Sequence, residues 1–323
     1  MKKIFLAMML LATFIFAGCN TQAAVKNDEL QISMLNVGHA DTHLIRTKEQ
    51  TILIDTGHRR APERLIRELE KFSVTKIDKL ILTHPHIDHI GNAGMLIKPS
   101  EKQLAAFPYL EKISVEKVYD NGIPFAGPSY KAYMKAIEAT GTPRQGLKVG
   151  DVLDFGGGVK FTVLWPTSEY VAEMNAGKAD SGDRVYKMNN ASVVGRLTYK
   201  NFSMMFTGDC ERESEAKIVK ANDAKDLKCD ILKAGHHGSK NSSLKAFVKA
   251  VNPEYVLIPA GSKEESEDAK GTPHLKLLER FSELGIDPKK IFCTRWNKTV
   301  TVTTDGKNFS VTPEVREDWS TGG

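Results

Sequence analysis

Short apolar runs of strand length recur along most of this chain, separated by polar turns. Runs with apolar residues at alternating positions, or apolar throughout, are typical of half-buried and fully buried strands respectively. They predict strands at Leu30–Val37, His43–Arg46, Thr51–Asp55, Lys79–Thr83, Val159–Leu164, Ser192–Tyr199, Phe202–Thr207, Ile231–Ala234 and Tyr255–Pro259. Two further runs, Thr299–Thr304 and Asn308–Thr312, predict a hairpin around Asp305-Gly306.

Amphipathic stretches between these runs predict helices. Pro62 suits a first helical position, and after it Leu65, Ile66, Leu69 and Phe72 share one face. The other predicted helices are Leu104–Leu110, Tyr130–Ala139, Leu244–Val251 and Leu275–Leu284, and Pro166–Met188 is predicted as a long loop. Each half of the chain starts with a strand meander and ends with strand–helix alternation. This order predicts an α/β fold with two sheets inside and helices outside.

The N-terminus has the pattern of an export signal. Lys2 and Lys3 precede an apolar run, Ile4–Phe16, which is shorter than the ~20 residues that span a bilayer as a helix. Ala17-Gly18-Cys19 resembles the box at which bacterial lipoproteins are cleaved and lipidated on the cysteine. We therefore expect a lipoprotein signal peptide at 1–19, a tether at 20–29, one folded domain at 30–313 and a tail at 314–323. Plain secretion of a soluble form is the alternative.

Net charge says little about the partners of the protein, and the cysteine content does not indicate disulfides. Removing Lys2 and Lys3 with the signal lowers the formal charge from +5 to +3, which gives no case of its own for a polyanionic partner. Beyond Cys19, the remaining cysteines are Cys210, Cys229 and Cys293, an odd number without clustered spacing. They predict small buried thiols and no disulfide framework.

The strongest chemical signal is a run of four potential metal ligands directly after a predicted buried strand. His84, His86, Asp88 and His89 fall within six positions of the sequence. A divalent metal needs imidazole and carboxylate groups converging within about 2.0–2.2 Å of the ion. A loop at a strand end can gather such side chains, whereas a regular strand would send alternate ones to opposite faces. The run therefore predicts a metal site.

Three further clusters of acid or histidine follow apolar runs later in the chain. They are Asp209, the pair His236/His237, and His274. Catalytic and metal-binding groups are concentrated on loops at the ends of regular elements. Together with the first cluster, these residues provide enough donors for two metal ions.

With these motifs, the sequence resembles the metallo-β-lactamase superfamily. The resemblance is narrower to its branch related to the hydrolase domain of the competence DNA-uptake protein (ComEC-type), a branch that includes cell-surface phosphorylcholine esterases. The motifs that carry the resemblance are Leu35–Asp41, Leu53–Gly57, Asn189–Ser192, Phe206–Asp209 and the His-His-Gly-Ser run ending at Ser239. The resemblance implies a four-layer αββα sandwich that binds two divalent metal ions, zinc or alternatively manganese.

The resemblance also implies a role for each ligand. His84 and His86 would hold one metal, Asp88 and His89 the other, and Asp209 would bridge both. One of His236 and His237, with His236 preferred, would complete the first site, and His274 the second. Asp88 and Asp209 would act on a metal-bridging hydroxide that attacks the substrate.

Other residues are expected around the ligands. Asp55 would brace the metal loop, although a simple turn role before Gly57 is equally open, and Asn190 and Ser239 would be supporting or substrate-contacting residues. His39 and Ala40 depart from the Gln-Gly of the family's first motif, and Pro273 precedes His274 where the family has His-Pro. His39, His43 and His58 are expected not to be ligands.

The relatives named above predict a phosphodiesterase that acts outside the cytoplasm, anchored to the membrane through Cys19. An envelope phosphodiester fits such a location. Nucleic acid is the less favoured substrate, because Lys263–Asp268 is acidic and DNA binding relies on cationic side chains at phosphates. The alternatives are a non-catalytic envelope binding or scaffold protein and a carboxylic-ester or lactam hydrolase. No protein partner is evident.

Overall fold

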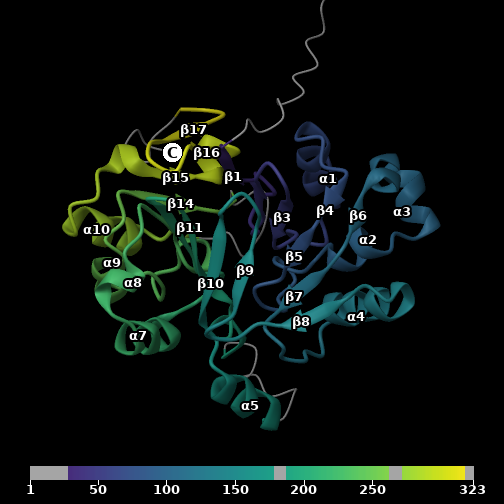
Figure 1. The fold of residues 1–323 in the computed structure, drawn as a ribbon, viewed down its shortest axis with the longest axis horizontal. Helices are drawn as coiled ribbons and strands as arrows, with labels where there is room; N and C mark the ends of the chain where they lie inside the picture. Colours follow the sequence, from purple (N-terminus) through teal and green to yellow (C-terminus); the bar gives the residue numbers. More distant parts are fainter. Residues whose placement is uncertain (1–27, 178–186, 262–270, 317–323) are drawn as a thin grey trace, which may run out of the picture.

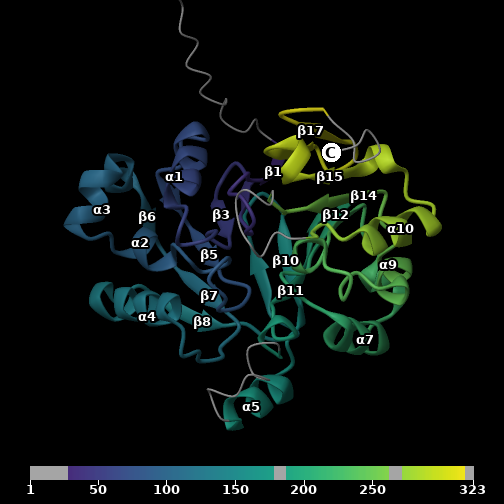
Figure 2. The ribbon, with the colours of Figure 1, turned by 180° about the vertical axis from the view of Figure 1, so that it is seen from behind.

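The computed structural model describes residues 28–177, 187–261 and 271–316 (Figures 1 and 2). The expected signal peptide and Cys19, most of the tether, the acidic run Lys263–Asp268 and the end of the tail lie outside these residues. Within them, no helix is both long and apolar enough to cross a bilayer.

The first half of the chain builds most of one sheet and the helices on its outer face. Its elements are β1 (Leu30–Met34), β2 (His43–Arg46), β3 (Thr51–Ile54), α1 (Pro62–Lys71), β4 (Lys76–Ile77), β5 (Lys79–Ile81), α2 (Ala93–Ile97), α3 (Glu101–Ala106), η1 (Pro108–Lys112), β6 (Ser114–Val115), β7 (Val118–Asp120), α4 (Pro128–Thr140) and β8 (Arg144–Gly146). The sheet runs β17-β16-β1-β2-β3-β5-β7-β8, so the last two strands of the chain return to it beside β1.

The second half builds a seven-stranded sheet in the order β15-β14-β13-β12-β11-β10-β9. Its elements are β9 (Val152–Asp154), β10 (Lys160–Trp165), α5 (Ser168–Ala176), β11 (Val194–Tyr199), β12 (Phe202–Phe206), α7 (Arg212–Ala221), α8 (Ala224–Leu227), β13 (Ile231–Lys233), η2 (His236–Gly238), α9 (Lys245–Val251), β14 (Tyr255–Ile258), α10 (Leu275–Glu283), η4 (Pro288–Lys290), β15 (Ile291–Cys293) and α11 (Thr294–Asn297), followed by β16 (Val300–Thr304) and β17 (Phe309–Pro313) of the first sheet.

Side-chain alternation along the strands divides the apolar residues into three clusters. In β3, Ile52 and Ile54 enter the cluster between the sheets, whereas Leu53 enters the cluster under α1, α2 and α4. In β12, Phe206 faces the other sheet and Met205 faces the cluster under α7, α9 and α10. Because successive residues of a strand point to opposite faces, two sheets with three apolar layers form. The result is the predicted αββα sandwich, whose helices cover both outer faces in Figure 1.

The structure corrects two of the predicted elements. The helix predicted at Leu104–Leu110 is divided into α3 and η1, because Pro108 has no N–H with which to continue a helix. The loop predicted at Pro166–Met188 contains α5, whose first turn is capped by the Thr167 side chain accepting from the Tyr170 N–H. The sequence analysis also left several elements unassigned, among them the short strand β7 and the ten-residue helix α7.

Candidate metal centre

The predicted ligands meet where strands of the two sheets end at one edge of the sandwich. In the first sheet β3 and β5 are parallel, so Asp55 and the loop that starts at His84 leave from the same edge. In the second sheet β12 and β13 are parallel, which brings together Asp209 and the pair His236/His237. The carboxyl ends of parallel strands share an edge, and this topology gathers residues that are distant in sequence.

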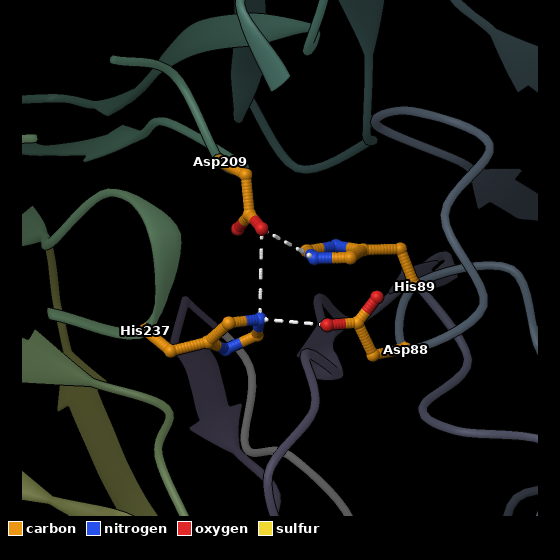
Figure 3. A group of neighbouring side chains, drawn as sticks. All are labelled: Asp88, His89, Asp209 and His237. Atoms are coloured by element: carbon orange, nitrogen blue, oxygen red, sulfur yellow. Dashed lines mark hydrogen bonds and ion pairs between the residues drawn. The ribbon is translucent and has the colours of Figure 1, made fainter. Parts of the chain in front are cut away.

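Four of the predicted ligands form a compact group (Figure 3), in which the potential ligand atoms all lie within 4.8 Å of one another. They are Asp88, His89, Asp209 and His237. His89 Nε2 lies 3.2 Å from Asp209 Oδ2. His237 Nε2 lies 3.1 Å from Asp88 Oδ2 and 3.6 Å from Asp209 Oδ2. Two imidazoles and two carboxylates are a donor set that zinc and similar divalent ions bind.

A second set of nitrogen atoms also lies near the Asp209 carboxylate. His84 Nε2 and His86 Nδ1 are 3.0 Å apart. The Nε2 atoms of His84 and His236 lie 3.9 Å and 3.8 Å from Asp209 Oδ2. Asp209 is therefore common to both sets, and both members of the His236/His237 pair face it, His236 with His84 and His237 with His89.

Hydrogen bonds to the Nδ1 atoms orient two of these imidazoles, those of His89 and His237. Asp55 lies 2.7 Å from His89 Nδ1 and also accepts from both the N–H and the hydroxyl of Thr83. His237 Nδ1 lies 2.8 Å from the carbonyl oxygen of Pro259. When Nδ1 carries the proton for such a bond, Nε2 presents its lone pair to the centre. Asp55 thus braces the loop from His84 to His89 through its bonds to Thr83 and His89.

Two atoms at the centre test whether a metal suits it. His89 Nε2 and Asp209 Oδ1 are buried and make no well-aligned hydrogen bond within the described residues, and their charged neighbours are Asp209 Oδ2 at 3.2 Å and the Lys233 ammonium at 3.9 Å respectively. Buried polar atoms without a hydrogen bond are uncommon in folded proteins, and here they belong to a nitrogen and an oxygen that metals coordinate. The residues present therefore fit a divalent metal.

The charges at the centre also fit a site for a divalent metal. Burial alone would raise the pKa of Asp209, but His89, His237 and His236 hold it well below its usual range. Burial alone would lower the pKa of His237, but Asp209 and Asp41 raise it to about 10. Without a metal, then, the imidazole of His237 is protonated at neutral pH and balances the carboxylates. Metal binding must displace such protons.

Other predicted site residues lie apart from these groups. The side chain of His274 caps its own helix, with Nδ1 accepting from the Lys276 N–H at 3.1 Å. The Asn190 amide oxygen accepts from the N–H and hydroxyl of Ser214, and the Ser239 hydroxyl accepts from the Asn241 N–H.

The histidines expected not to ligate differ in their surroundings. His39 packs its ring 4.6 Å from that of His237, and its Nδ1 accepts from the Gly261 N–H. His43 is buried with its ring edge against Phe206. His58 Nδ1 accepts from the Arg60 N–H. None of the three is in a group that could hold a metal among the described residues.

Sequence reasoning missed four residues at the centre. Glu211 lies 2.7 Å from His236 Nδ1, and Asn189, not the predicted Asn190, faces the same nitrogen at 3.4 Å. Asp41 and Lys233 form a buried ion pair beside His237. One signal was available, because Lys233 is a lysine at the end of an otherwise apolar strand, and lysine is almost never fully buried without a partner.

Comparison with known proteins agrees with this fold. The model of the metallo-beta-lactamase superfamily matches residues 35–168, which include the first metal-binding loop. The chain therefore contains a metallo-β-lactamase superfamily domain.

Curated relatives support the ComEC-like branch. The chain is 27% identical to ComE operon protein 3 of Bacillus subtilis (strain 168), over 85% of this chain and 33% of that protein. It is 26% identical to competence protein ComA of Neisseria gonorrhoeae, over 79% of this chain and 30% of that protein. The match thus spans about a third of the length of these relatives.

A solved structure shows the same fold at lower sequence similarity. The metallo-beta-lactamase fold protein YhfI from Bacillus subtilis superposes with a TM-score of 0.50 and 14% identity. The match covers 85% of this chain and all of YhfI. This similarity supports the fold.

Proposed function

We propose that the protein is a metal-dependent phosphodiesterase with two metal ions, zinc or alternatively manganese, that works outside the cytoplasm. The observation that carries the proposal is that the Asp209 carboxylate is shared by two sets of donors. One set contains His84, His86 and His236, and the other contains Asp88, His89 and His237, with Asp209 near both.

The chain's own residues hold and orient this centre. Divalent ions bound there would activate water and neutralise negative charge on phosphoryl oxygens. Asp88 and Asp209 provide carboxylate oxygens beside the reacting group, and Asp55 and Glu211 keep the imidazoles of His89 and His236 in place. Such preorganised groups need no rearrangement when charge develops in the transition state.

The proposed substrate is a phosphodiester of the cell envelope. Lipidation at Cys19 would hold the enzyme at the membrane, within reach of lipid or polymer head groups. Nucleic acid remains the second substrate class, since the relatives include a competence protein. The exposed Arg59 and Arg60 follow Gly57, close to the metal loop, and offer two cations for either substrate.

Hydrolysis of two chromogenic esters tests the activity. The form that begins at Asn20 would be assayed with bis(p-nitrophenyl) phosphate and p-nitrophenyl phosphorylcholine, with zinc or manganese added. We expect metal-dependent turnover that the Asp209→Ala and Asp88→Ala/His89→Ala variants lose. The preferred ester then separates choline-type from general phosphodiester substrates.

The results also separate the alternatives. No turnover by a protein that binds two metals would exclude phosphodiesterase activity on these esters and favour an ester or lactam substrate. No turnover together with less than one metal per chain would favour a binding protein. The location is tested by expressing the full chain and Cys19→Ala, because only the former should partition with membranes.

A further inference from the structure

Lys233, at the end of β13, places a positive charge inside the protein next to the metal centre. Its side chain is 1% exposed. The ammonium lies 2.5 Å from Asp41 Oδ2, donates to the carbonyl oxygen of Gly208, and lies 3.9 Å from Asp209 Oδ1. An ammonium is costly to bury unless it is paired and hydrogen-bonded. These contacts meet that requirement.

Asp41, in the loop between β1 and β2, touches several parts of the centre. Its N–H donates to the carbonyl oxygen of Asp88 at 3.1 Å, and its own carbonyl oxygen accepts from the Gly57 N–H at 3.0 Å. Its Oδ1 lies 3.3 Å from His237 Nδ1. Asp41 therefore connects the metal-binding loop of the first sheet to a histidine of the second.

Lys233 also restrains Asp209 through its hydrogen bond to the carbonyl oxygen of the preceding residue, Gly208. Gly208 immediately precedes Asp209 and has a φ of +48°, a conformation that glycine adopts without steric cost. Its carbonyl oxygen also accepts from the His236 N–H at 3.3 Å. A fixed peptide at Gly208 restricts where Asp209 can point.

We infer that Lys233 and Asp41 are a pair of positioning residues. They set the metal loop, which belongs to the first sheet, at the correct distance from Asp209 and His237, which belong to the second. Metal affinity therefore depends on the pair, although neither residue is a ligand. The inference rests on the metal-binding part of the proposed function and deepens it.

The same contacts argue against a further metal site at a neighbouring group. Asp41, Asp55 and His89 also lie close enough together to hold an ion. However, His89 Nδ1 already bonds Asp55, and the Lys233 ammonium already neutralises Asp41. The Lys233 ammonium thus supplies the positive charge at this group, and His89 Nε2 remains the atom of His89 that can bind a metal.

The test measures metal affinity in Lys233→Met and in Asp41→Asn. The first removes the charge while keeping most of the side-chain volume, and the second is nearly isosteric and keeps the backbone bonds of Asp41. Zinc affinity would be measured by competition with a fluorescent chelator. The visible spectrum of the cobalt-loaded protein reports ligand geometry, and the unfolding temperature of the metal-free protein reports stability.

Glu68→Gln is the matched control. Glu68 is a buried carboxylate in α1 that accepts from the Thr299 hydroxyl and pairs with Lys71, away from the metal centre. The control should lower the unfolding temperature while leaving zinc affinity and the cobalt spectrum unchanged. Lys233→Met and Asp41→Asn should weaken zinc affinity about 10- to 100-fold, as substitutions that disturb ligand orientation do, and alter the spectrum.

The outcomes distinguish this inference from the proposed function. If both variants bind zinc as the wild type does and lose only thermal stability, as Glu68→Gln does, the positioning role is refuted while the enzyme proposal stands. If Lys233→Met does not fold, Asp41→Asn alone decides in the same way. A wild-type protein that binds no metal overturns both.

Discussion

Oε1 of Glu211 and Nδ1 of His236 lie 2.7 Å apart, at the start of α7 and in the loop after β13 respectively. The carboxylate accepts a hydrogen bond from the Nδ1–H of the imidazole, so Nε2 of His236 is directed toward Asp209 at 3.8 Å. A histidine held in this way is a better metal ligand than a free one, because its tautomer and ring orientation are already set.

Glu211→Ala should weaken the binding of one of two metal equivalents by about 10- to 100-fold, since His236 loses its orienting acceptor. Isothermal titration with zinc would measure both equivalents. Glu213→Ala is the control in the first turn of α7, because Glu213 pairs with the exposed Lys217 and such surface pairs contribute little. Equal affinities in the two variants would contradict the role of Glu211.

His237→Ala and His274→Ala should have opposite consequences for metal content. His237 Nε2 lies among Asp88, His89 and Asp209, so its removal should cost one metal per chain. His274 caps α10, so its removal should cost about 1 kcal/mol of stability and leave two metals bound. Elemental analysis of both purified variants measures their metal content. Loss of metal from His274→Ala would show that His274 is a ligand.

Gly91→Ala should prevent the metal loop from forming. A Cβ at this position would lie 2.3 Å from the Arg59 nitrogen and 2.4 Å from the Ile87 carbonyl oxygen, and neither backbone atom can move freely. We expect a loss of about 3 kcal/mol or more in the free energy of unfolding. Gly157→Ala, which meets no atom within 4 Å, should lose only about 1 kcal/mol because of its positive φ. Urea unfolding of the two variants compares these losses, and equal values would contradict the packing at Gly91.

Glu215 should make the protein less stable as pH rises from about 4.5 to 7. Burial raises the pKa of this carboxyl from 4.5 to about 7, although the N–H groups of Leu244 and Ser243 and the charge of Arg280 oppose the shift and Glu211 adds to it. The folded state then binds the proton more tightly than the unfolded state, so raising the pH removes stabilisation.

The slope attributable to Glu215 is at most about 1.4 kcal/mol per pH unit in that window. Urea unfolding of the wild type and of Glu215→Gln at several pH values would isolate it, because all other groups titrate in both proteins. Parallel curves for the two proteins would show that the Glu215 carboxyl has an ordinary pKa. The variant also loses one acceptor for the Ser243 and Leu244 N–H groups, which lowers its stability equally at every pH.

Local sequence determined the fold class and most of the ligands. Strand periodicity is a property of neighbouring residues, so Thr51–Asp55 and Phe202–Thr207 could be recognised without knowing their partners, and β3 and β12 lie there. The loop from His84 to His89 is similarly local. Its four donors fall within six positions, and the spacing alone indicated a metal site.

Tertiary structure decided which distant residues join that loop. Both His236 and His237 face Asp209 because β12 and β13 are parallel neighbours, and neither the choice of one histidine nor the place of His274 followed from spacing. The Asp41–Lys233 pair was also hidden, because a charge pair across two sheets depends on the packing of those sheets and not on sequence distance. The sequence was enough to predict the donors at each strand end. Which of these donors lie near Asp209 was determined by the packing of the two sheets.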